Sequence, residues 1–192
     1  KEEIKGPGAD RGMVFQTYTL FPWLTVQKNV EFGLRIKGIP SSERAEIARH
    51  YIELVGLTGF ENMLPKALSG GMKQRVAIAR ALANKPEVLL MDEPFGALDA
   101  QTRVVMQELL MSVWEKEKTT VLFITHDIDE AVMLASNIYV MSRRPGTIKA
   151  RLNIDIPYPR NHQVMVLPEF ISAKKNIMEM LWEESKAAAS QR

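Results

Sequence analysis

The sequence predicts an α/β fold in which a parallel sheet core is interrupted by a helical insert. Two short, wholly apolar runs, Val88–Met91 and Val121–Ile124, have the length and composition of strands buried on both faces of a parallel sheet. Helical patterns separate the apolar runs, and strands that alternate with helices are typical of a parallel sheet with crossover helices. A longer stretch of helical pattern, at about Thr25–Asn84, precedes both runs. We therefore expect the insert to occupy that stretch.

The composition is that of a globular domain with a sizeable core, because 46% of the 192 residues are hydrophobic and 25% are charged. The net charge of +2 is too small to indicate a nucleic-acid partner, and no basic patch with interleaved aromatic residues occurs. Cysteine is absent, which excludes disulfides and cysteine metal sites. No apolar stretch approaches the roughly 18 residues of a membrane-spanning helix, so we expect any membrane role to require a partner.

Apolar spacing indicates the first elements of the core and of the insert. Met13–Phe15 is a short apolar run that ends at Gln16 and predicts a strand. From Thr25 to about Lys37 apolar residues recur every four positions, which predicts a helix with Thr25 as its N-cap. The expected apolar face of this helix comprises Val26, Val30 and Leu34.

Two further helices are expected to complete the insert. The second begins after Pro40, where we expect Ser41 or Ser42 to cap it, and Gly56 is placed to stop it. The third spans Ser69 to about Asn84.

The remaining elements return to the core. A helix is expected from about Asp99 to Lys116 and another around Ile128–Leu134, followed by a strand at Ile138–Met141 that would join the parallel sheet. The pattern at about Pro168–Ala189 indicates an amphipathic helix that packs on the core or on a partner.

Two adjacent carboxylates, Asp92 and Glu93, follow the apolar run Val88–Met91 directly. Ligands of open parallel sheets bind at the carboxyl ends of the strands, and carboxylates buried there without a function would be costly. Asp92 is placed to hold Mg²⁺ through water, and Glu93 is placed to polarise a water that attacks a phosphate. The alternative is a pair of acids in a surface turn.

Two other polar residues end predicted strands. If its strand neighbours that of Glu93, His126 would face the same site, where it could hydrogen-bond a γ-phosphate and orient the attacking water. The amide of Gln16 could bind Mg²⁺ or that water. Each also has a simpler interpretation, a structural histidine for His126 and a polar strand end for Gln16.

The stretch Leu68–Arg75, with the sequence LSGGMKQR, opens the third predicted helix. A helix start offers unpaired N–H groups and a positive dipole end, Gly70 and Gly71 would let an anion approach, and Ser69 adds a hydroxyl donor. A serine-capped helix after a glycine turn is the alternative. Asp99 opens the next helix, where an N-cap alone would explain it.

Taken together, these motifs resemble the ABC ATPase family. The resemblance covers about Gly6 to Met141 and rests on the order of five motifs: Gln16 (Q-loop), Leu68–Arg75 (signature), Val88–Glu93 (Walker B), Gly96–Asp99 (D-loop) and Thr125–Asp127 (H-loop). It implies a P-loop NTPase-like fold that uses ATP and Mg²⁺.

The resemblance also implies roles for single residues. In the family, two subunits sandwich two ATP molecules head to tail, which implies a homodimer. The implied catalytic residues are Glu93, His126 and Gln16, and the implied Mg²⁺ ligands are Asp92 and Gln16. The residues implied to bind ATP in trans are Leu68, Ser69, Gly70, Gly71 and Gln74. Asp99 would lie at the dimer interface, and Met72 stands where many members have Gln.

Two segments, Gly6–Gln16 and Leu20–Val26, are similar to the nitrate/sulfonate/taurine importer group. This similarity implies an ATP-hydrolysing subunit on the cytoplasmic face of the cell membrane. Its partners would be a second ATPase subunit, membrane permease subunits and, indirectly, a substrate-binding protein, with no nucleic acid. Tyr18, Phe21 and Trp23 are candidates for the permease contact, although core packing would also explain them.

With the motifs assigned, the expected organisation is a partial ABC ATPase domain over residues 1–192. Its parts are a core strand with the Q-loop (1–24), a helical subdomain with the signature (25–84), an α/β core with Walker B, D-loop and H-loop (85–150) and a C-terminal extension with the amphipathic helix (151–192).

No Gly-x-x-x-x-Gly-Lys-Ser/Thr loop occurs in the chain. We expect that loop to lie before Lys1, and we expect negligible ATP turnover by this chain alone. Two other function classes stay open: a soluble ABC ATPase that acts on nucleic acid or ribosomes, and, for this chain as it stands, a non-hydrolysing partner. Glu93 and His126 argue against the second for a complete subunit. The transported substrate is not encoded here.

Overall fold

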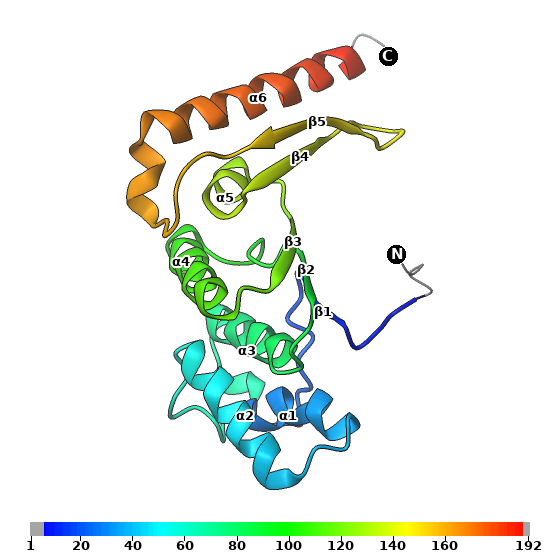
Figure 1. Ribbon diagram of the computed structural model, residues 1–192, viewed down its shortest axis with the longest axis vertical. Coiled ribbons are helices and arrows are strands. Elements are labelled where there is room, and N and C mark those ends of the chain that lie inside the picture. Colours follow the sequence, from blue (N-terminus) through cyan, green and yellow to red (C-terminus); the bar gives the residue numbers. More distant parts are fainter. Residues whose placement is uncertain (1–5, 190–192) are drawn as a thin grey trace. The chain divides into compact units, whose positions relative to one another are not determined.

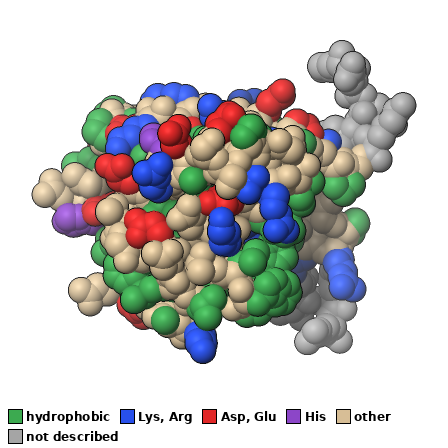
Figure 2. Space-filling model, turned by 90° about the horizontal axis from the view of Figure 1, so that it is seen from below, with side chains coloured by type: hydrophobic (Ala, Val, Ile, Leu, Met, Phe, Trp, Pro, Cys, Tyr) green, Lys and Arg blue, Asp and Glu red, His purple; other side chains and the backbone are tan. Residues whose placement is uncertain are grey.

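The computed structural model describes residues 6–189, and the chain separates into two compact units, Lys1–Ile124 and Thr125–Arg192 (Figure 1). On the face seen in Figure 2, basic and acidic side chains are interspersed with hydrophobic ones. No helix among the residues described is long and apolar enough to cross a membrane.

The first unit contains the predicted parallel sheet. Its strands are β1 (Arg11–Val14), β2 (Val88–Asp92) and β3 (Thr120–Ile124), paired in parallel in the order β1-β2-β3. Val14 pairs with Met91, which in turn pairs with Phe123, so the three carboxyl ends lie at one edge. The predicted strand Met13–Phe15 is shifted, because Phe15 lies beyond the ladder and is 43% exposed.

The prediction that both apolar runs are buried on both faces was wrong. Burial alternates along β2, where Leu89 and Met91 are buried and their neighbours are only partly covered. In β3, Leu122 and Ile124 are 54% and 53% exposed. An apolar run shows that a strand avoids water, but the helices that pack on each face decide how much of the run is buried.

The helical insert consists of α1 (Val26–Ile36), α2 (Ser41–Leu54), the short 3₁₀ turn η1 (Pro65–Ala67) and α3 (Gly70–Leu82). Figure 1 shows α1, α2 and α3 gathered in one cluster. Their shared core is fully buried and includes Val26, Val30, Leu34, Ala48, Tyr51, Ile52, Val76 and Ile78. The first unit also contains α4 (Ala100–Glu117), which follows the D-loop.

Local capping predictions were confirmed at most helix starts. The Thr25 hydroxyl accepts a hydrogen bond from Lys28 N at 3.2 Å, and Gly56 follows α2 with a φ of +68°. The prediction of a serine cap for α2 was wrong. Pro40 occupies the cap position without a side-chain hydrogen bond, and Ser41 is already the first helical residue, where its hydroxyl cannot cap the helix.

The second unit contains α5 (Ile128–Leu134), β4 (Asn137–Met141), β5 (Ile148–Asn153), η2 (His162–Val166) and α6 (Pro168–Ala189). The helices confirm the predictions, but β4 does not join the parallel sheet: it pairs antiparallel with β5, which the sequence analysis missed. The return is tight, since Ser142 N donates to Thr147 O at 2.8 Å. Apolar and polar residues alternate in β5, and this signal could have revealed the strand.

The core of the second unit lies between the hairpin and the two helices. Phe170 and Ile177 of α6 pack with Val132, Met133, Ile138 and Val140. Arg160 is buried among these elements and is 3% exposed. Its guanidinium donates to the carbonyls of Val132 and Ala135 at 2.9 Å and of Ile156 at 2.6 Å. A cation at the last carbonyls of α5 satisfies the helix end and complements its dipole.

Candidate functional site

The carboxyl edge of the parallel sheet brings together two of the predicted site residues. Gln16 follows β1, and Glu93 directly follows β2. Because these strands are paired in parallel, both side chains lie at the same edge, and Gln16 Nε2 donates to Glu93 Oε2 at 3.2 Å. The third strand also contributes, since Glu93 N donates to Ile124 O at 2.9 Å. Glu93 is therefore held from both neighbouring strands.

Glu93 adopts an unusual backbone conformation, with a φ of +42°. A non-glycine residue in this region is strained by about 1–3 kcal/mol and persists only where its surroundings impose it. Here Glu93 O accepts from Gly96 N at 3.1 Å, which closes the turn after β2. A Cβ at Gly96 would lie 3.1 Å from Gln16 Nε2, so glycine leaves room for the Gln16–Glu93 contact. Strain of this kind is concentrated at functional sites.

Asp92 ends β2 beside Glu93 and is partly buried. In the part of the chain that the structure describes, no cluster of three or more His, Cys, Asp or Glu side chains is suited to a metal ion. Mg²⁺ commonly uses only one or two protein carboxylates together with phosphate oxygens and water. The predicted Mg²⁺ contacts of Asp92 and Gln16 do not require a protein-only cage, and they stay a prediction.

The signature stretch opens α3 as predicted. Ser69 is the N-cap, and its hydroxyl accepts from Met72 N at 3.3 Å. Both glycines also have a packing role, because a Cβ at Gly70 would lie 2.8 Å from Tyr18 Oη and one at Gly71 would lie 2.8 Å from Thr102 Cγ2. Ser69 is exposed at the helix start, where its hydroxyl and the first N–H groups of a helix can meet an anion.

Two other signature residues are less accessible. Gln74 is fully buried, and neither its amide oxygen nor its amide nitrogen has a hydrogen-bond partner among the described residues. Leu68 is also buried, at 5% exposure. Their predicted contact with ATP stays a prediction, and the buried position of Gln74 is a reason to test it separately from Ser69.

Asp99 caps α4, as predicted. Its Oδ1 accepts from Thr102 N at 2.9 Å and its Oδ2 accepts from the Thr102 hydroxyl at 2.7 Å. These hydrogen bonds, first the backbone one and then the side-chain one, hold the pKa of the Asp99 carboxyl below its usual value. The cap accounts for an acid at this position, and the predicted role at a dimer interface stays a prediction.

His126 belongs to the second unit and lies between β3 and α5. The segment around it is held locally. Asp127 caps α5 by accepting from Asp129 N at 2.9 Å, and the Thr125 hydroxyl donates to the buried Glu130 carboxylate at 2.7 Å. These contacts fix the start of α5, while the predicted meeting of His126 and Glu93 stays a prediction.

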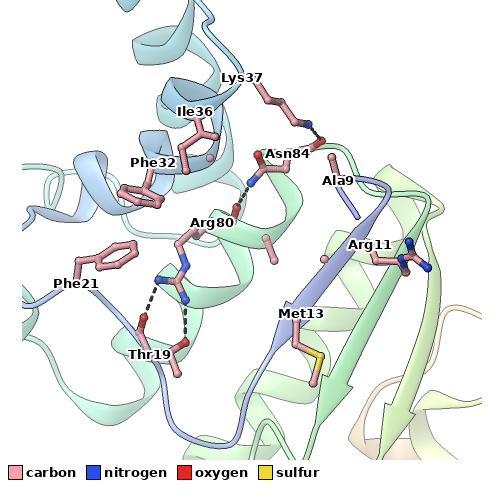
Figure 3. Close-up of a pocket in the computed structure, with 13 residues that line it drawn as sticks. Ala9, Arg11, Met13, Thr19, Phe21, Phe32, Ile36, Lys37, Arg80 and Asn84 are labelled. Atoms are coloured by element: carbon pink, nitrogen blue, oxygen red, sulfur yellow. Dashed lines mark hydrogen bonds between the residues drawn. The ribbon is translucent and has the colours of Figure 1, made fainter. Parts of the chain in front are cut away.

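The candidates for a permease contact lie on the loop after Gln16. Trp23 is 73% exposed, and its ring lies 5.8 Å from that of Phe21, which also packs against Phe32 at 4.3 Å. Beside this loop is a pocket of about 500 Å³ (Figure 3). Its lining comes from β1, the loop, α1 and α3, and includes Met13, Thr19, Phe21, Phe32, Ile36 and Arg80. Of the three candidates, Phe21 is the one that lines the pocket.

Sequence reasoning missed two residues that shape this loop, Asn29 and Arg80. The Asn29 side chain is fully buried, accepts from Phe21 N at 2.9 Å and donates to Leu24 O at 2.9 Å. Its position between Val26 and Val30 on the apolar face of α1 was a signal, since a polar residue there needs buried partners. Arg80 donates to Thr19 O, and nothing in the local sequence indicates that pair.

Known proteins similar to this chain share its motifs and fold. A family profile described as "ABC transporter" matches residues 1–96. An uncharacterized ABC transporter ATP-binding protein of Methanocaldococcus jannaschii is 57% identical over 183 residues, which are 95% of this chain and 67% of that protein. A nitrate import ATP-binding protein of Synechocystis sp. is 51% identical and covers 98% of this chain and 75% of its own length. A taurine import ATP-binding protein of Pelagibacter ubique is 45% identical, with 94% and 69% covered.

Solved structures that resemble this chain are also ATP-binding cassettes. A dimeric post-hydrolysis state of an ATP-binding cassette bound to ADP and Pi matches with a TM-score of 0.64 and 36% identity. The match covers 77% of this chain and 64% of that one, so the chain spans less than two thirds of that structure. With the α/β fold, the ordered motifs and these similarities in agreement, the chain belongs to the ABC transporter ATPase family.

Proposed function

We propose that the chain is the ATP-hydrolysing part of an importer subunit for nitrate, a sulfonate, taurine or a similar small anion. The observation that carries the proposal is the contact between Gln16 and the strained Glu93 at the carboxyl edge of the sheet. The named nitrate and taurine import relatives support the substrate class. They support a substrate class and no single substrate, because the residues of the proposed site act on ATP and do not contact the transported anion.

The side chains at the edge have separable tasks in this proposal. Glu93 accepts a proton from the water that attacks the terminal phosphate, and its imposed backbone conformation aims the carboxylate. Gln16 donates to Glu93 at 3.2 Å and keeps its amide oxygen for Mg²⁺ or for that water. Asp92 holds Mg²⁺ through water, and the ion, when bound with ATP, neutralises charge on the phosphates. His126 orients the attacking water from the segment after β3.

A second copy of the subunit completes each site in this proposal. Ser69 is exposed at the start of a 13-residue helix, where its hydroxyl and the positive end of the helix dipole suit a partner's phosphate. Dimeric cassettes among the similar structures support such an arrangement. Leu68, Gly70, Gly71 and Gln74 would support Ser69 from the same helix start, and Asp99 would face the partner.

In this proposal the subunit lies on the cytoplasmic face of the cell membrane, and its partner there is a membrane permease that is served in turn by a substrate-binding protein. The exposed ring of Trp23 and the pocket beside Phe21 supply an apolar surface for it, and Tyr18 lies on the same loop. Transport specificity would then reside in the permease and the binding protein.

A substitution of the proposed general base tests the function. In a subunit that carries this sequence together with a phosphate-binding loop, Glu93→Gln is expected to lower the rate of ATP hydrolysis by about 10²–10⁴-fold. ATP binding, measured by equilibrium dialysis, should be retained because the amide is isosteric. Glu87→Gln is the matched control, since Glu87 is exposed just before the opposite end of β2. Equal turnover in the two variants would remove Glu93 from the proposed role.

A further inference from the structure

Arg80, near the end of α3, binds the loop that follows Gln16. Its Nη1 donates to Thr19 O at 2.7 Å, and its Nη2 donates to the Thr19 hydroxyl at 2.9 Å (Figure 3). The same guanidinium lies 5.6 Å from the centre of the Phe21 ring. Its Nη2 also donates to Tyr18 O at 3.5 Å, so one side chain of α3 contacts the loop through three hydrogen bonds and a cation–π contact.

Thr19, the residue that Arg80 binds, has a strained backbone conformation. Thr19 has a φ of +45°, in a region that β-branched residues rarely enter. Its carbonyl and its hydroxyl are the two groups that Arg80 binds. Because strained residues persist only where their surroundings impose them, the Arg80 contacts account for the conformation of Thr19.

The loop and α3 also touch at the other end of the helix. The Tyr18 hydroxyl lies where a Cβ on Gly70 would come within 2.8 Å of it, at the start of α3. The loop is thus attached to α3 at both ends, at Gly70 through Tyr18 and at Arg80 through Thr19. These ends differ in chemistry, since the contact at Gly70 is steric and the contact at Arg80 consists of hydrogen bonds from a charged donor to neutral acceptors.

The contact at Arg80 differs from an ordinary surface interaction. Burial lowers the pKa of the Arg80 guanidinium from its usual value, although an arginine stays charged at any physiological pH. Hydrogen bonds from a charged donor are about twice as strong as neutral ones, and the planar fork of arginine fits two acceptors at once. Lysine has no such fork, so Arg80→Lys keeps the charge and loses the paired geometry.

From these contacts we infer that Arg80 is a positioning residue for Gln16, which it keeps within reach of Glu93 by locking the loop onto α3. This inference rests on the proposed function of Gln16 and Glu93. It has a further consequence: Gln16, which serves the subunit's own site, and Ser69, at the start of the same helix, move as one body. The subunit's own ATP site, which uses Gln16, and the partner's site, which uses Ser69, are then linked through α3.

Hydrogen exchange on the 192-residue chain, without any nucleotide, tests whether Arg80 holds the loop after Gln16 on α3. Arg80→Lys is expected to speed exchange in the peptide covering residues 16–24 by about 10-fold, because that segment would open locally. The control is Lys37→Met, which removes another cation from the same pocket. The Nζ of Lys37 donates to Asn84 O at 2.8 Å and does not contact the loop. Exchange that is as slow in Arg80→Lys and Arg80→Ala as in Lys37→Met would overturn the inference.

Kinetics on a subunit with a phosphate-binding loop test the positioning role. Arg80→Lys is expected to lower kcat about 10-fold with KM for ATP within about 2-fold, since a small misplacement of a catalytic group has that scale. In a Gln16→Ala background the same substitution should cause no further loss, because the effect passes through Gln16. An equal loss in both backgrounds would reduce Arg80 to a structural residue. Failure of Glu93→Gln to impair turnover would instead refute the proposed function. The hydrogen-exchange result would still decide whether Arg80 holds the loop on α3.

Discussion

Replacing Asn29 by alanine removes the buried centre of the loop between Gln16 and α1. The side chain accepts from Phe21 N and donates to the carbonyls of Phe21, Leu24 and Thr25, at distances between 2.9 and 3.2 Å. A buried hydrogen bond contributes about 0.5–1.5 kcal/mol, and groups left unpaired add a cost. Because water can reach part of the loop after the substitution, we expect the first unit to lose about 3 kcal/mol of unfolding free energy.

The assay is urea unfolding of the 192-residue chain, with hydrogen exchange of α1 peptides to report on the first unit alone. Asn29→Asp should lose about as much, since it keeps an acceptor but buries a charge. Gln27→Ala is the control, because Gln27 makes a single side-chain bond to Glu31 at 2.7 Å on the same helix, and it should cost under about 1 kcal/mol. An Asn29→Ala loss below that of Gln27→Ala would refute the account of the loop.

Two other perturbations follow from particular contacts. Gly96→Ala should lower ATP turnover about 10-fold in a subunit with a phosphate-binding loop, because the new Cβ would crowd Gln16 Nε2 at 3.1 Å; Gly146→Ala, with its nearest neighbour at 3.9 Å, should have no effect, and equal rates would contradict the prediction. Burial and then the Glu117 carboxylate raise the pKa of Tyr51 from 10.0 to about 12. The unfolded chain therefore loses this proton first, so the stability from Tyr51 is full below pH 10 and is lost as the pH rises towards 12. Urea unfolding of Tyr51→Phe should show a smaller loss of stability at alkaline pH than Tyr139→Phe, since Tyr139 is 48% exposed, and identical losses would contradict this prediction.

The sequence predicted those features that depend on neighbours along the chain. Thr25, Ser69 and Asp99 cap helices as expected, because capping joins residues only two or three positions apart. The meeting of Gln16 and Glu93 was also predictable, since both follow apolar strands and parallel strands end at one edge.

Features that depend on distant partners were not predictable where no shared end of parallel strands brings the partners together. The strand Ile138–Met141 was recognised, but its antiparallel pairing with β5 depends on a turn and on a second strand with a polar face. Arg80 reads as a solvent-facing residue of an amphipathic helix, and its partner Thr19 lies 61 positions away. The burial of Gln74 likewise depends on how α3 packs, which the glycine-rich motif does not indicate.

Arg160 makes the second unit behave as a single cooperative element. Its guanidinium joins the last turn of α5 to Ile154 and Ile156, segments that are about 20 positions apart in the chain. Neither segment can detach without stranding a buried cation, so partial opening is more costly than its length suggests. Proteolysis or hydrogen exchange would therefore find this unit either closed or wholly open, with no frayed intermediate between α5 and the residues that follow the hairpin.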